Sequence, residues 1–156
     1  MYTWNLDSLY KGFDEKFYSD VEELEKSIEV FIETVNKEKG LDAVKYIESV
    51  LKIEEKISIL SRTLFSFASL TNATDIGDEK SLVELSKLSN IVDKMTKSDV
   101  IFARFIEKQD LEKLAEKSDL ISLYIFNLND TKKNAKHLLT EKEEILYSKI
   151  DRKSVV

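Results

Sequence analysis

The stretch IEEKISILSRTLFSFASL, residues 53–70, decides the fold of this chain. Its apolar side chains recur at steps of four, three, four and three residues, at Ile53, Ile57, Leu60, Leu64 and Phe67. This spacing places them on one face of an α-helix, as in a helix that packs along its whole length. From Ile57 to Leu70 the only charged side chain is Arg62, which predicts burial on several sides.

The predicted central helix extends outward from this stretch, from about Asp42 to about Thr71. Another helix precedes it, and Ser19 with Glu22 three residues later forms a capping box that predicts its start. Gly40 is a natural stop for that helix, because glycine readily takes the left-handed turn. Its apolar face follows the same helical spacing, through Leu24, Ile28, Phe31, Ile32 and Val35.

The second half of the chain continues the helical pattern after the turn TNATDIGDEK. We expect a helix over residues 79–107, with an inward face made of Leu82, Leu85, Leu88, Val92 and Met95. The stretch KSDVIFARF either kinks this helix or begins a new one capped by Ser98. A short helix is expected over Leu111–Glu116, another over Leu120–Lys136 with Ile121, Tyr124, Ile125 and Leu128 inward, and a last one from Thr140.

The composition favours long, uninterrupted helices. There is no proline, and glycine occurs only at positions 12, 40 and 77. We predict an all-α fold, in which residues 1–156 form a single domain, a bundle of about five to six mostly antiparallel helices with no sheet.

The charges argue against some classes of partner. The net charge is −6, and the 24 basic residues are scattered among 30 acidic ones, so no nucleic-acid partner is expected. There is no cysteine, which excludes disulfides and thiolate metal sites. No apolar run approaches the roughly 18 residues of a membrane span, and no signal peptide is visible, so a cytoplasmic protein with no membrane partner is expected.

Two residues are candidates for a chemical site. His137 is the only histidine and stands before three glutamates, but a zinc site needs about three protein ligands. Thr140 with Glu143 instead forms a capping box, so a structural role for His137 is favoured. Arg62 can bind a carboxylate bidentately, but a structural role, paired with a buried acid or reaching solvent, is favoured there too.

Other catalytic patterns are missing from the sequence. No serine lies in a Gly-x-Ser-x-Gly elbow, and three scattered glycines cannot make a phosphate-binding loop. The acidic runs VEELEK and IEEK are interpreted as solvated helix faces. We therefore predict no catalytic, cofactor-binding or metal-binding residue in this chain.

Three stretches, taken together and in order, resemble the N-terminal region of the oligoendopeptidase F family. The first is TWNLDSLYKGFDEK, which resembles the family's opening motif at Trp4, Asn5, Leu6, Leu9 and Tyr10. The second is similar at Phe67, Ala68, Leu70 and Asp75, with Phe67 where the family has tyrosine. The third matches a Tyr…His-x-Leu-(Ser/Thr)-x-x-x-Glu pattern at Tyr124, His137, Leu139, Thr140 and Glu144.

This resemblance implies a zinc metallopeptidase that hydrolyses short peptides. The family's zinc-binding His-Glu-x-x-His helix lies in a later catalytic region, and this chain contains no such motif. The resemblance therefore implies a non-catalytic helical portion that shapes the substrate channel, with the catalytic domain of the same protein as its partner. The zinc would belong to the parent enzyme, and the chain would be an excised domain or a truncated product.

The alternative is a free-standing helical interaction module without enzymatic activity, with an apolar groove for a partner helix. Under either hypothesis an exposed apolar patch is expected. The candidates for it are Phe65, Phe102, Phe105 and Phe126, although each is also typical of a core.

Overall fold

The computed structural model describes residues 10–37, 42–74 and 79–135, and these are almost entirely helical. The helices are α1 (Glu15–Asn36), α2 (Ala43–Thr74), α3 (Glu79–Asp93), α4 (Thr96–Glu107), α5 (Leu111–Lys117) and α6 (Asp119–Leu123). Residues 125–135 are helical as well. The described residues contain no strand, so the predicted all-α fold is confirmed.

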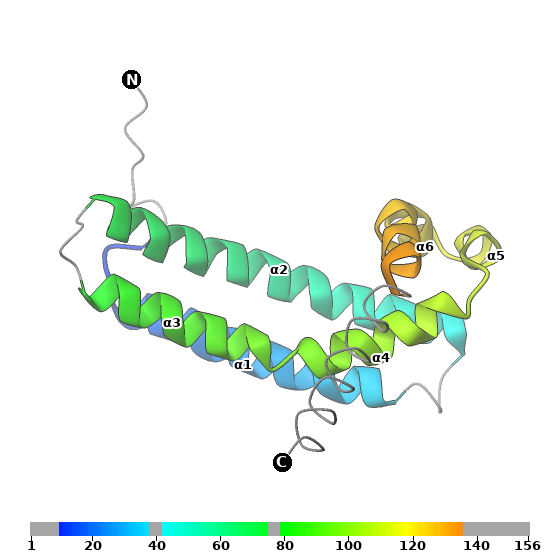
Figure 1. The fold of residues 1–156 in the computed structure, drawn as a ribbon, viewed down its shortest axis with the longest axis horizontal. Helices are drawn as coiled ribbons and strands as arrows, with labels where there is room; N and C mark the ends of the chain where they lie inside the picture. Colours follow the sequence, from blue (N-terminus) through cyan, green and yellow to red (C-terminus); the bar gives the residue numbers. More distant parts are fainter. Residues whose placement is uncertain (1–9, 38–41, 75–78, 136–156) are drawn as a thin grey trace, which may run out of the picture.

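The first three helices lie side by side, and each runs opposite to the one before it (Figure 1). α2 packs against both α1 and α3, and α4 continues in the direction of α3 along the bundle. α5 and α6 lie at the end of the bundle where α2 begins. None of the described helices is long and apolar enough to cross a membrane.

The packed face of α2 is the one that the sequence predicts. Ile57, Leu64 and Phe67 are buried, and Ile53 and Leu60 are partly buried against the same core. The predicted face of α1 is confirmed in the same way: it buries Leu24, Ile28, Phe31 and Val35, and Ile32 is partly buried. The contact between these two apolar faces is the most extensive helix–helix contact among the described residues.

Aromatic side chains close the core at both ends of α2. At its C-terminal end Tyr10 meets Phe67 edge to face, with ring centroids 5.2 Å apart, and Phe17 packs beside them. At its N-terminal end Tyr46 is fully buried, and its ring lies 4.6 Å from that of Phe105. Edge-to-face pairs of this kind stabilise a core beyond the area that they bury.

The predicted start of α1 is wrong. The helix begins at Glu15, because the carboxylate of Asp14 accepts a hydrogen bond from the backbone N–H of Phe17 at 3.0 Å. Ser19 therefore lies inside the helix, on its exposed side. An acidic N-cap accepts a hydrogen bond from a free backbone N–H group, and its negative charge interacts favourably with the positive end of the helix dipole. The expected stop at Gly40 lies outside the described residues.

Between α3 and α4 the structure selects one of the two predicted alternatives: a new helix begins. The backbone N–H groups of Lys94 and Met95 bond to carbonyls three residues back, at 3.3 and 3.0 Å, which ends α3 in a tight turn. Ser98 is not the cap, since α4 begins at Thr96 and Ser98 is buried inside it. Leu82 was expected to face inward but is 53% exposed.

The two helices predicted to follow α4 are confirmed, with one interruption in the second. α5 begins after Asp110, whose carboxylate accepts from the N–H of Lys113. The helix expected over Leu120–Lys136 is divided at Tyr124, which ends α6, and helical backbone resumes at residues 125–135. Ile121 and Leu128 are buried as predicted. The helix expected from Thr140 lies outside the described residues.

Candidate functional site

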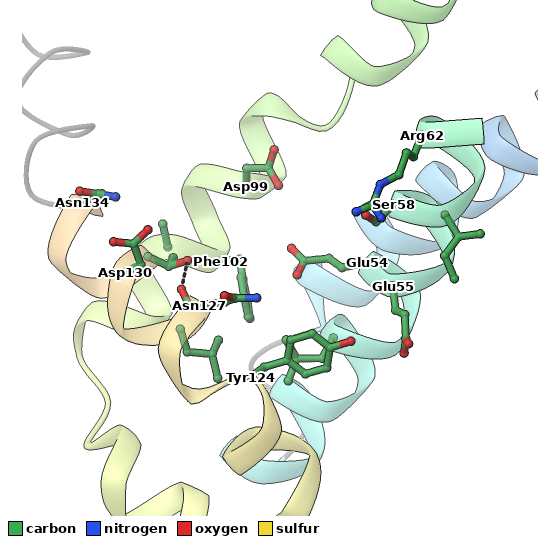
Figure 2. Close-up of a pocket in the computed structure, with 15 residues that line it drawn as sticks. Glu54, Glu55, Ser58, Arg62, Asp99, Phe102, Tyr124, Asn127, Asp130 and Asn134 are labelled. Atoms are coloured by element: carbon green, nitrogen blue, oxygen red, sulfur yellow. Dashed lines mark hydrogen bonds between the residues drawn. The ribbon is translucent and has the colours of Figure 1, made fainter. Parts of the chain in front are cut away.

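A groove of ≈ 630 Å³ lies between α2, α4 and the helical segment 125–135 (Figure 2). α2 forms one side, residues 125–135 form the other, and α4 lies between them. The charged side chains that line it are Glu54, Glu55, Arg62, Asp99 and Asp130, and the amides of Asn127 and Asn134 line it as well. The groove is thus built from parts of the chain that are far apart in sequence.

The spacing of residues along α2 explains how this helix faces both the core and the groove. Leu51, Glu54 and Ser58 line the groove. Glu54 directly follows the core residue Ile53, and Ser58 directly follows the core residue Ile57. One residue turns an α-helix by about 100°, so the groove face lies beside the core face. The groove face carries polar side chains such as Glu54 and Ser58 together with the apolar Leu51 and Ile59, whereas the core face is apolar.

The far side of the groove is fixed in place by core packing and by one long-range hydrogen bond. Leu128 points into the core and is 2% exposed. The ammonium group of Lys132 donates to the backbone carbonyl of Gln109 at 2.6 Å, which ties the segment to the turn after α4. The hydroxyl of Thr131 donates to the backbone carbonyl of Asn127 at 3.0 Å, the bond drawn in Figure 2.

The base of the groove is apolar, and its rim is acidic. Leu51, Phe102 and Leu128 are buried beneath it. Above them the carboxylates of Glu55, Asp99 and Asp130 are exposed, one on each of the three elements. An apolar base under a charged rim is the usual character of a ligand site, in which apolar area supplies affinity and a few charges set orientation.

Glu54 is the carboxyl group with the most perturbed chemistry in the groove. Burial, together with the negative charge of Asp99, raises its pKa from 4.5 to about 7. Figure 2 shows the side chains of Glu54 and Asp99 pointing toward the space between α2 and α4. Desolvation favours the neutral acid and a nearby like charge adds to the effect, so Glu54 titrates near neutral pH.

Arg62 lines the groove but is not paired with a buried acid. Its side chain is exposed, and no ion pair joins it to another described residue. Of the two structural roles considered for it, the solvent-exposed one applies. Figure 2 places its guanidinium beside Ser58, at one end of the groove. His137 lies outside the described residues, so its predicted structural role stays a prediction.

The groove carboxylates were not predicted as a site. The interpretation of IEEK as a solvated face holds for Glu55, which is exposed, but it is wrong for Glu54. Nothing in the local sequence separates these two residues. The burial of Glu54 comes from α4 and residues 125–135, whose positions only the tertiary structure gives.

The groups that line the groove are suited to holding a ligand. No group of three histidine, cysteine or carboxylate side chains in residues 10–37, 42–74 and 79–135 is placed to hold a metal ion. The site does combine an acidic rim, an apolar base and neutral hydrogen-bonding groups such as the amide of Asn127. Such a set of groups can hold a ligand with cationic and apolar parts.

An exposed apolar pair lies near the groove. Of the four phenylalanines predicted as an exposed patch, Phe126 alone is exposed, at 79%. Phe102 is buried, and Phe65 and Phe105 pack against the core. Leu123, three residues before Phe126, is 75% exposed. The prediction of a patch is therefore correct only for Phe126.

The fold and the groove together define a helical bundle with a ligand-sized site among its described residues. No protein-family model matches this chain, and neither a curated protein nor a solved structure matches it.

Proposed function

We propose that this chain is a non-catalytic helical domain of a zinc metallopeptidase similar to oligoendopeptidase F. The observation that carries the proposal is the order of the three motif stretches, which include Trp4, Phe67 and Tyr124. The all-α fold of the described residues is consistent with it, because that region of the family is helical. In this role the domain forms one wall of a channel that admits short peptides.

The proposal assigns the zinc to another part of the parent protein. A peptidase zinc needs about three protein ligands and an open position for water. The described residues offer no such group, and the whole chain contains a single histidine and no cysteine. The domain would act by steric selection: a narrow channel admits an extended chain and excludes a folded protein.

The first test is the coding sequence downstream of Val156. An in-frame His-Glu-x-x-His motif supports the proposal. The longer protein should then hydrolyse an internally quenched short peptide in a zinc-dependent manner, while residues 1–156 alone should not. Zinc-dependent hydrolysis by residues 1–156 alone would contradict the proposed division of labour.

A second candidate function is a free-standing interaction module, and the exposed pair of Leu123 and Phe126 favours it. These two side chains lie three residues apart in the sequence and are 75% and 79% exposed, and a partner that covers them would remove apolar surface from water. A stop codon directly after Val156, with no peptidase domain encoded in frame, would favour this function over the first.

A further inference from the structure

The groove has the length of a short extended peptide. On α2 it runs from Leu51 to Arg62, which at 1.5 Å per residue is about 16 Å of helix. An extended chain advances about 3.3 Å per residue, so about five residues span the same length. The amides of Asn127 and Asn134 and the hydroxyl of Ser58 line the groove. These groups can bond to the free N–H and C=O groups of an extended backbone.

The charge of the groove selects the side chains of its ligand. Four carboxylates line it, those of Glu54, Glu55, Asp99 and Asp130, against the single guanidinium of Arg62. Alternate side chains of an extended peptide point in opposite directions. When one set lies on the apolar base formed by Leu51, Phe102 and Leu128, the other set reaches the acidic rim.

We propose that the groove between α2, α4 and residues 125–135 binds a short extended peptide segment in which basic side chains alternate with apolar ones. The proposal goes beyond the proposed function, since it requires the groove alone and applies equally to a peptidase domain and to an interaction module. Two features carry it: the apolar base, and carboxylates on each of the three surrounding elements.

The titration of Glu54 adds a pH signature to this binding. Burial and the charge of Asp99 raise the pKa of Glu54 to about 7, so the wild-type groove gains negative charge between pH 6 and pH 8. The groups that face it are Asp99 on α4, Asp130 on the far side, and Glu55 and Arg62 on its own helix. A bound cation favours the ionised form of Glu54, so basic peptide should bind more tightly at pH 8 than at pH 6.

The test compares two peptides by isothermal titration calorimetry on residues 1–156. The probe is acetyl-Leu-Lys-Phe-Lys-Leu-amide, and the matched control is acetyl-Leu-Gln-Phe-Gln-Leu-amide. We expect the lysine peptide to bind about tenfold more tightly, because partly exposed charge pairs contribute up to about 1 kcal/mol each. The difference should shrink in high salt, which screens such pairs.

Protein variants locate the binding. The double variant Asp99→Asn with Asp130→Asn removes charge from the rim and should weaken binding of the lysine peptide about tenfold. The control, Glu29→Gln with Glu33→Gln, changes the net charge equally at exposed positions on α1, away from the groove, and should alter affinity less than twofold. Circular dichroism checks that both double variants fold. If Asp99→Asn with Asp130→Asn does not fold, Glu55→Gln replaces it as the rim variant.

Three results would overturn the inference: no binding of the lysine peptide, equal binding of the two peptides, or equal weakening by the rim and control variants. Equal or tighter binding of spermidine, which has amines but no bulky apolar side chains, would reassign the groove to small polyamines. None of these results bears on the downstream reading frame, so this inference and the proposed function fail independently.

Discussion

Glu54 should destabilise the folded chain at neutral and alkaline pH, and replacing it with glutamine should remove that effect. The residue is a partly buried carboxyl group on α2, and Asp99 of α4 opposes its ionisation. Glutamine has nearly the same shape but carries no charge. The substitution Glu54→Gln therefore keeps the packing of the groove and removes one titratable carboxyl group.

The size of the effect follows from the pKa. Raising it from 4.5 to about 7 corresponds to about 3 kcal/mol, at about 1.4 kcal/mol per pH unit. Between these two values the folded state holds a proton that the unfolded state has released. Stability contributed by Glu54 is therefore lost as the pH rises from 4.5 to 7, and the loss is complete above 7.

The assay is urea unfolding of the wild type and Glu54→Gln at pH 4.5, 6, 7 and 8, followed by circular dichroism. We expect a difference of less than about 0.5 kcal/mol at pH 4.5, rising to about 2–3 kcal/mol in favour of the variant at pH 8. Glu55→Gln, the exposed neighbour, is the control and should change stability by less than about 0.5 kcal/mol at every pH.

A pH-independent difference between wild type and Glu54→Gln would refute the reasoning, because only a titrating group gives a difference that grows with pH. A variant less stable than the wild type at pH 8 would also refute it. That result would mean that the ionised carboxylate has a favourable partner outweighing its burial and the charge of Asp99.

Three further predictions concern single buried polar groups, each measured by urea unfolding at constant pH. Tyr46→Phe should cost about 1–2 kcal/mol, because the phenol donates to the backbone carbonyl of Val35 at 3.0 Å in a buried site and the substitution removes that bond. Ser27→Ala should stabilise the fold by up to about 1 kcal/mol, because the buried Ser27 hydroxyl has no hydrogen-bond partner among the described residues; unchanged or lower stability would contradict this. Ser118→Ala should instead cost about 1–2 kcal/mol, because that hydroxyl caps α6 and bonds to Glu48; a neutral result would show that the cap contributes little.

The helical architecture could be predicted from the sequence because it depends on local periodicity. The spacing of apolar residues from Ile53 to Phe67 predicts a packed face on α2, whichever helix packs against it. The absence of proline leaves the helix unbroken. The start of α1 was harder, since Asp14 and Ser19 are both plausible caps within one segment. Packing of Tyr10 and Phe17 against Phe67 favours the earlier start, and that contact spans some fifty residues of sequence.

The groove could not be predicted, because its residues gain their properties from distant partners. Glu54 and Glu55 are adjacent and chemically alike, yet one is partly buried and the other is exposed. The difference depends on where α4 and residues 125–135 pack. Their placement in turn depends on the break before Thr96 and on the interruption at Tyr124. No proline or glycine stands at either position to predict these breaks from the sequence.

Glu54 offers a way to separate a structural residue from one retained for binding. A purely structural residue should weaken the fold when replaced, whereas a residue that serves a ligand can lower stability and still be useful. At pH 8 we therefore expect Glu54→Gln to be more stable than the wild type and to bind acetyl-Leu-Lys-Phe-Lys-Leu-amide about threefold more weakly, since one negative charge is lost. Near pH 4.5, where wild-type Glu54 is protonated, both differences should disappear. Calorimetry and urea unfolding on the same samples test this. Glu55→Gln is the control for stability, and Glu29→Gln, exposed on α1 away from the groove, is the control for affinity. If Glu54→Gln is more stable than the wild type but binds the lysine peptide equally well, Glu54 does not contribute to peptide binding.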